Sequence, residues 1–153
     1  SVLLFWALIF LVLSRFYIGV NPSSVSCLKV YVLLVDKKDK DVSRGELAAF
    51  EFQQTLRHLN AGDKIGKIVA GIPGDTVEFD ENNLYVNGVK FNKVMSMSPM
   101  LSFFNQEISE YKTTYTLKDD EFFMVGETLE SYDSRYWGPI KKSQIVGQAY
   151  AIY

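Results

Sequence analysis

The N-terminal part of the chain is its most apolar stretch. Residues 2–13 contain no charged side chain, and Arg15 is the only one up to position 20. A helix needs roughly 20 apolar residues to cross a bilayer. Residues 1–20 are therefore predicted to form an uncleaved single-pass membrane anchor, with Arg15 at or near the interface. The alternatives are a cleaved leader, for which no small-x-small cleavage site is obvious, and a buried core helix.

Beyond residue 20, short β-branched and aromatic runs alternate with turn-forming residues. The strongest turn signals are Gly71-Ile72-Pro73-Gly74-Asp75 and Asn87-Gly88. Residues 54–61 are expected to be a loop or briefly helical, and residues 91–111 irregular. Many short strands with turns between them predict a mostly β domain over residues 21–153, packed as an open barrel or a sandwich. Strands are predicted over residues 30–35, 47–52, 67–70, 76–79, 84–86, 122–125 and 145–152.

The composition of the chain limits the kinds of functional site that it can form. The chain has 153 residues, enough for one core, and its net charge of −2 does not suggest a nucleic-acid partner. Cys27 is the single cysteine and cannot form an intrachain disulfide, and no Cys/His set has the spacing of metal ligands. We expect no metal and no cofactor. His58 is the single histidine, so serine chemistry in this chain is expected to use lysine instead.

Three segments carry candidate chemistry: residues 24–27, residues 67–75 and residues 126–140. Taken singly, each has an ordinary explanation. Serines after an apolar span are common turn residues, and a lysine before a Gly-x-Pro-Gly-Asp turn is usually solvated. Asp133 and Arg135 on their own could form a surface ion pair. The order of the three segments along the chain gives them more weight than any one of them alone.

Together the segments resemble the signal peptidase I family. Residues 67–75 fit its Lys-Arg-x-x-Gly-x-Pro-Gly-Asp pattern, except that Ile68 replaces the arginine. The late segment fits its Gly-Asp-Asn…Ser-x-Asp-Ser-Arg pattern, with Glu127 and Thr128 in place of Asp-Asn. Arg44-Gly45-Glu46 is similar to the Arg-Gly-Asp that precedes a strand in the family. The positions that match in the late segment are Gly126, Ser131, Asp133, Ser134, Arg135, Trp137 and Gly138.

The nucleophile segment fits the family least well. Its pattern is Ser-x-Ser-Met-x-Pro, in which the second serine attacks; here Cys27 replaces methionine and Lys29 replaces proline. The conjugative-transfer branch, which matures pilus proteins, has Asn-x-Ser/Thr-x-Ser-x-Pro-x-Gly-x-Tyr. Asn21, Ser23 and Tyr31 fit that spacing, but it places Val25 at the nucleophile. Valine cannot attack, so Ser26 is predicted to be the nucleophile, with Ser24 as the second candidate.

The resemblance implies a role for each matched residue. Ser26 attacks, Lys67 is the general base, and the oxyanion is bound by the Ser26 N–H and the Ser24 hydroxyl. A lysine can accept a proton only when neutral, which burial against apolar side chains favours. Ser131 is expected to orient the lysine by a hydrogen bond. Structural support is expected from Asp133, Arg135, Gly71, Pro73, Gly74 and Asp75.

The function implied is that of a membrane-bound serine endopeptidase with a Ser/Lys dyad. Its expected partners are a leader-peptide-bearing substrate and the lipid bilayer, and its expected place is the bacterial inner membrane with the catalytic domain facing the periplasm. Maturation of pilin or other conjugative-transfer proteins is the preferred subtype. One alternative is an inactive family member that acts as a membrane-anchored assembly factor. Another, a self-cleaving repressor-like protease, is disfavoured by the anchor and by the lack of a DNA-binding segment.

Overall fold

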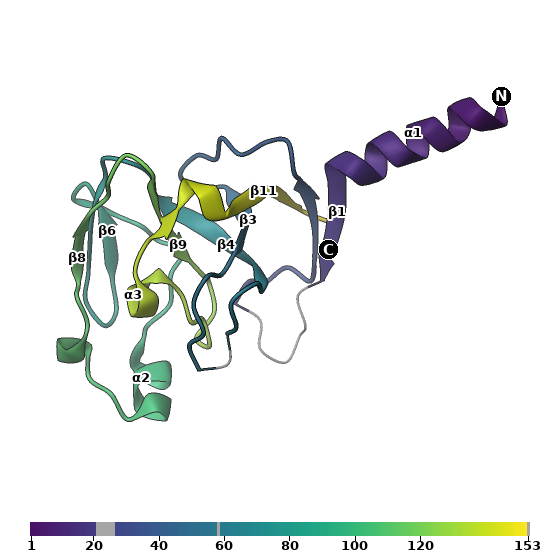
Figure 1. The fold of residues 1–153 in the computed structure, drawn as a ribbon. Helices are drawn as coiled ribbons and strands as arrows, with labels where there is room; N and C mark the ends of the chain where they lie inside the picture. The colour runs from purple at the N-terminus through teal and green to yellow at the C-terminus, as the bar shows by residue number, and fades with distance from the viewer. Residues whose placement is uncertain (21–26, 58, 153) are drawn as a thin grey trace.

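A computed structural model describes residues 1–20, 27–57 and 59–152 of the chain. A helix, α1 (Val2–Arg15), projects from a body made mostly of strands (Figure 1). The other helical segments are α2 (Ser98–Phe104), η1 (Ile108–Glu110), α3 (Ser134–Trp137) and η2 (Lys142–Gln144). The strands are β1 (Phe16–Val20), β2 (Val32–Asp36), β3 (Leu47–Glu51), β4 (Lys64–Gly71), β5 (Thr76–Phe79), β6 (Leu84–Val86), β7 (Val89–Lys90), β8 (Thr114–Thr116), β9 (Glu121–Val125), β10 (Ile140–Lys141) and β11 (Ile145–Ala151).

The strands form two antiparallel sheets. The larger has seven strands in the order β1-β2-β11-β3-β4-β9-β10, and the smaller has four in the order β7-β6-β5-β8. The C-terminal strand β11 therefore lies between β2 and β3. One end of the larger sheet is β1 and the other is β10, so within the described part of the chain this sheet is open. The predicted mostly β class is confirmed.

The hydrophobic core lies where the two sheets meet. Val35, Ile68 and Val125 from the larger sheet pack in one buried cluster with Val77 and Leu84 from the smaller sheet. A second cluster covers the other face of the larger sheet, where Phe50, Val69 and Met124 are fully buried beside the partly buried Trp137. β4 and β9 therefore have apolar side chains on both faces, which makes them central strands and fixes their register.

The hairpin of β5 and β6 has the limits that the sequence predicts. Val77 and Phe79 are buried while Glu78 is exposed, which is the two-residue period of a half-buried strand. Asn87 and Gly88 both have positive φ, as a tight hairpin turn requires, and they connect β6 to β7. The predicted turn is thus present, and it leads into a short strand that was not predicted.

The N-terminal helix ends earlier than expected. The residues predicted as an anchor, 1–20, are not one continuous helix, because residues 16–20 form β1 and pair with β2 from Phe16↔Asp36 to Val20↔Val32. Arg15 marks the change: its Nε lies 3.0 Å from each carboxylate oxygen of Asp36. The aromatic and β-branched residues after Arg15 suit a strand as well as a helix, and the neighbouring edge of β2 decides between them. In the described part of the chain, no helix is both long and apolar enough to cross a membrane.

Residues 91–111 are also more regular than expected. They contain α2, whose first turn carries Pro99 and whose end is marked by Asn105 in the left-handed conformation. Proline at the start and a left-handed residue at the end are typical helix boundaries, so the signals were present in the sequence. Residues 54–57 and 59–61 form a loop, which was the first of the two alternatives, and Leu56 and Leu59 make an isolated bridge in it.

Candidate active site

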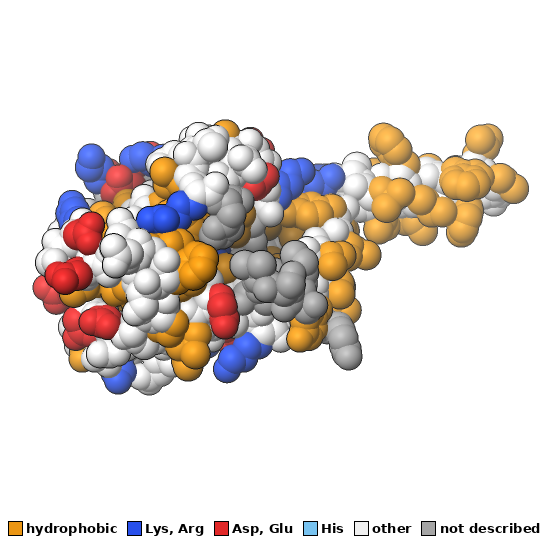
Figure 2. Space-filling model, turned by 90° about the horizontal axis from the view of Figure 1, so that it is seen from below, with side chains coloured by type: hydrophobic (Ala, Val, Ile, Leu, Met, Phe, Trp, Pro, Cys, Tyr) orange, Lys and Arg blue, Asp and Glu red, His pale blue; other side chains and the backbone are white. Residues whose placement is uncertain are grey.

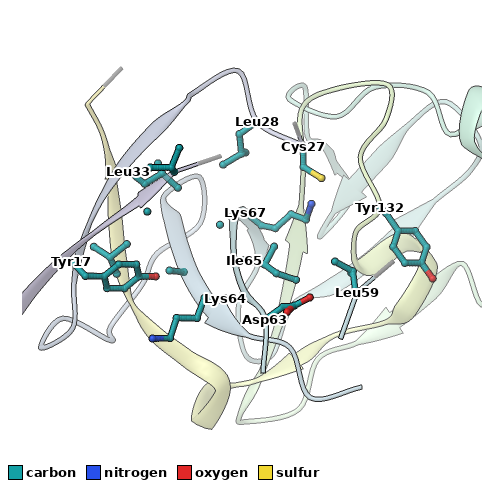
Figure 3. A pocket seen from close by; sticks show the side chains of 15 residues that line it. Tyr17, Cys27, Leu28, Leu33, Leu59, Asp63, Lys64, Ile65, Lys67 and Tyr132 are labelled. Carbon is teal, nitrogen blue, oxygen red and sulfur yellow. The ribbon is translucent and has the colours of Figure 1, made fainter. Parts of the chain in front are cut away.

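A pocket of about 440 Å³ opens where β4 meets the segment that begins at Cys27. Figure 3 shows the Lys67 side chain stretching across this pocket toward Cys27, with Tyr132 on the far side. The walls are mostly apolar and come from β1, β2, β3 and β4. The apolar residues among those that line it include Val20, Leu28, Leu33, Val35, Ala49, Leu59 and Ile65.

Lys67 is the buried amine of this pocket. It lies in the middle of β4 opposite Ala48 of β3, and only 1% of its surface is exposed. Its Nζ has no hydrogen-bond partner among the described residues. The burial of Lys67 against apolar side chains, which the sequence predicts, is thus observed.

Asp133 is the centre of a hydrogen-bonded loop over residues 126–135, whose Tyr132 lines the pocket. Its carboxylate accepts hydrogen bonds from the Ser131 Oγ at 2.7 Å and from the Gly126 N–H at 3.0 Å. It also pairs with Arg135, whose Nη2 lies 2.8 Å from Oδ2. All four residues are buried. Burial alone would raise the pKa of Asp133, but the charge and hydrogen bonds of Arg135 outweigh it, so this pKa lies below its usual range.

Arg135 ties this loop to a distant part of the chain. Its Nη1 donates to the Met95 carbonyl oxygen at 2.7 Å, just before α2. Burial lowers the pKa of Arg135, but the Asp133 carboxylate has the larger combined effect and raises it above the usual value. The guanidinium therefore stays charged. The predicted Asp133–Arg135 pair is present, and it is a buried ion pair rather than a surface one.

Ser131 is placed differently from the expectation. A hydrogen bond from its hydroxyl to the Lys67 amine was predicted, whereas the hydroxyl donates to Asp133 and the amine has no partner among the described residues. The ionised carboxylate of Asp133 is a strong hydrogen-bond acceptor because of its negative charge. Orientation of Lys67 by a direct bond to Ser131 is not seen.

Gly126 allows three parts of the site to approach each other. A Cβ at this position would lie 2.5 Å from the Cys27 carbonyl oxygen and 2.8 Å from the Ser131 Cβ, and it would also clash with the Ser131 hydroxyl. No real Cβ sits that close to other heavy atoms, so any side chain here must push one neighbour away. Position 126 therefore sets the spacing between the segment at Cys27 and the loop at Ser131.

Gly126→Ala is accordingly expected to lower the kcat/KM of catalysis at this site about 10²-fold, which a displacement of roughly 1 Å can produce. The expected change is in turnover rather than in global folding. Thermal unfolding of the same variant separates the two, and wild-type turnover in a folded Gly126→Ala protein would contradict this account of the spacing.

The turn after the lysine strand has the geometry that its sequence suggests. Pro73 and Gly74 occupy the centre of a turn closed by the Asp75 N–H to the Ile72 carbonyl at 3.1 Å, and Gly74 has φ of 88°. Asp75 accepts from Arg44 through two bonds of 2.8 Å and from the Asn87 amide at 2.9 Å. Gly71 ends β4, where a Cβ would meet Val77 and Leu117 at under 3 Å. These contacts fix the turn that follows β4.

Two of the predicted site residues, Ser24 and Ser26, lie outside the described residues, as does His58. Cys27, the described residue that follows Ser26 in the sequence, lines the pocket with Lys67. Tyr132 is a pocket residue that the sequence did not single out, and its ring packs on Phe104 of α2 and on Tyr136. Among residues 1–20, 27–57 and 59–152, no group of three His, Cys, Asp or Glu could hold a metal ion.

Comparisons with known proteins point in one direction. A family model described as "Signal peptidase, peptidase S26" matches residues 1–153. A "Probable signal peptidase I-2" of Synechocystis is 30% identical over 112 residues, which are 72% of this chain and 48% of that protein. "Signal peptidase IB" of Staphylococcus aureus is 30% identical over 146 residues, 85% of this chain and 70% of that protein.

A third relative, "Signal peptidase I" of Bacillus caldolyticus, is 30% identical over 129 residues, 76% of this chain and 66% of that protein. Among solved structures, a signal peptidase I of Enterococcus faecalis V583 is similar at 25% identity with a TM-score of 0.48, covering 72% of this chain and 97% of that chain. The chain spans about half the length of the Synechocystis relative.

Proposed function

The chain belongs to the signal peptidase family of the peptidase S26 group, and we propose that it is a membrane-associated serine endopeptidase that removes leader peptides with a Ser26/Lys67 dyad. The observation that carries the proposal is the Lys67 amine, buried without a partner among the described residues and directed toward Cys27 (Figure 3). Ser26 is bonded directly to Cys27. Activation of a serine by lysine requires the amine close to the hydroxyl, and the position of Lys67 beside Cys27 supports this for Ser26.

In the proposed reaction, the Ser26 hydroxyl attacks the carbonyl carbon of the scissile bond and its proton passes to the neutral Lys67 amine. The negative charge that develops on the carbonyl oxygen is stabilised by the Ser26 N–H and the Ser24 hydroxyl. Lys67 then gives its proton to the leaving amine, and water releases the acyl group from Ser26. The apolar walls beside Lys67, including Leu33 and Ala49, would receive apolar side chains of the leader.

Helix α1 supports attachment to a lipid bilayer. None of its side chains is buried, and its apolar residues are strongly exposed, with Leu3 at 82% and Phe10 at 72%. Figure 2 shows hydrophobic side chains along the whole projecting helix, whereas charged groups are spread over the body. We place α1 in the bacterial inner membrane and the catalytic domain on its periplasmic face. Because β1 follows α1 directly and lines the pocket, the site would lie close to the membrane surface.

Within this function, pilin or another conjugative-transfer protein is the narrower substrate that we propose. Asn21, Ser23 and Tyr31 fit the motif of that branch, and transfer genes next to the gene of this chain would support it. The competing function is that of an inactive family member acting in assembly, which the altered residues Cys27 and Lys29 motivate. Cleavage of a leader-peptide-bearing protein by the purified full chain in detergent distinguishes the two, and complete absence of cleavage would favour the inactive form.

Ser24→Ala is expected to weaken cleavage by about 10²–10³-fold without abolishing it, because one oxyanion donor is lost while the nucleophile remains. The measurement is kcat/KM on the same leader substrate, with Ser23→Ala as the matched control. Cys27→Ala should remain active, since the thiol has no proposed role in the reaction. A dead Ser24→Ala together with an active Ser26→Ala would move the nucleophile to Ser24.

A further inference from the structure

The segment that follows the proposed nucleophile is held by one residue of the late loop. The Glu127 N–H donates to the Cys27 carbonyl oxygen at 2.8 Å, and the Glu127 carboxylate accepts from the Lys29 N–H at 2.9 Å. Cys27 and Lys29 lie in bends rather than in a strand, so no sheet pairing fixes this stretch. Glu127 bonds to two alternate residues of it, as a neighbouring strand would.

Glu127 and Lys29 are also two positions at which this sequence departs from the pattern that it resembles. That pattern has a proline where Lys29 stands, and proline has a fixed φ and no N–H. Lysine at this position introduces a backbone donor and removes the fixed φ. The structure places the carboxylate of Glu127, the other departing residue, at hydrogen-bond distance from that new donor. The two substitutions therefore meet in space although they are 98 positions apart.

We propose that Glu127 is a positioning residue: its carboxylate fixes the backbone at Lys29, in place of a proline, and so holds the segment from Cys27 to Lys29 against the loop of Ser131 and Asp133. This inference rests on the proposed Ser26/Lys67 peptidase. Among the described residues, Glu127 reaches Cys27 and Lys29 by these two hydrogen bonds, so the role proposed for it is to position the backbone. A hydrogen bond to an ionised acceptor is stronger than a neutral one, which suits a short segment without sheet pairing. The adjoining Gly126 lets the loop come this close.

The test is a double-mutant cycle on the full chain. Glu127→Ala is expected to lower kcat for leader cleavage by about 10–100-fold with little change in KM, because the nucleophile is misplaced while the substrate pocket remains. Glu127→Gln is expected to keep most of the activity, since its amide oxygen can still accept from the Lys29 N–H. Glu130→Ala, in the same loop and exposed, is the charge-matched control and should behave as wild type.

Lys29→Pro is the second background of the double-mutant cycle. It removes the donor and restores a fixed φ, so adding Glu127→Ala to Lys29→Pro should cause little further loss. Equal losses from Glu127→Ala in the two backgrounds would overturn the proposal, as would a fully active Glu127→Ala.

Backbone hydrogen exchange at Lys29 gives a readout that does not need catalysis or a folded Lys29→Pro protein. Exchange should be faster in Glu127→Ala than in wild type and Glu127→Gln. Unchanged exchange would refute the proposed role of the hydrogen bond from the Lys29 N–H to Glu127. If the wild-type chain cleaves nothing, the proposed peptidase function fails, and hydrogen exchange alone decides whether Glu127 holds this segment.

Discussion

Lys67→Met is expected to abolish leader-peptide cleavage while the protein stays folded. The general base and the activation of the nucleophile are lost together, so we expect kcat/KM to fall by about 10⁴-fold or more. Methionine fills a similar volume, and it replaces an amine that is 1% exposed and has no partner among the described residues. The midpoint of thermal unfolding should therefore stay the same or rise.

The matched control is Lys64→Met, three residues earlier in the same strand. Lys64 is exposed at the pocket rim, with its amine over the Tyr17 ring, so its loss should change turnover little. Ser26→Ala should match Lys67→Met, and the double variant should be no worse than either, because the two groups act as a unit. A dead Lys64→Met beside an active Lys67→Met would show that the wrong lysine was chosen.

Asp133→Ala is expected to lower the free energy of unfolding by about 3–5 kcal/mol, because it leaves the Arg135 guanidinium buried and unpaired. Asp133 is 0% and Arg135 3% exposed, so little solvent reaches the pair. The same change removes the acceptor of Ser131 and of the Gly126 N–H. Chemical denaturation measures the loss, with Asp41→Ala as the control, since the Asp41–Lys142 pair is exposed and should contribute nothing measurable. A loss as small as that of Asp41→Ala would mean that Arg135 finds other partners.

The pH dependence of stability follows from the same carboxylate. The pKa of Asp133 is lower in the folded state than in the unfolded chain. Its contribution to stability is therefore fully present above the ordinary aspartate value of about 3.9 and is lost as the pH falls from there through the lower, folded value. Asp133→Ala should lack this part of the acid-dependent loss. Comparison of the two proteins cancels Asp75, whose pKa is also lowered, because Arg44 and other donors outweigh its burial.

Several features could be predicted from local sequence because a local cause decides them. The β5–β6 hairpin follows from alternation, and the turn at Pro73 and Gly74 follows from backbone preferences. The burial of Lys67 was expected from the resemblance and its apolar neighbours. The hairpin and the turn need no information about the rest of the chain, whereas the resemblance draws on three separate segments of it.

Other features depend on partners that are distant in sequence. Residues 16–20 could be helix or strand, and only the edge of β2 selects the strand. The contact of Glu127 with the Lys29 N–H joins two residues that appeared in the sequence only as separate departures from a pattern. Such outcomes follow from packing, which periodicity does not encode.

The position of β11 has a consequence for the timing of activity during synthesis. β2 and β3 are made early, but the sheet leaves a gap between them that only residues 145–151 fill. A ribosome-bound chain that has already exposed Ser26 and Lys67 therefore cannot complete the sheet that carries them until β11 has emerged. Long-range pairing of this kind also forms slowly. Nascent chains should thus be proteolytically silent, and the enzyme would acquire its activity only after translation of the whole domain.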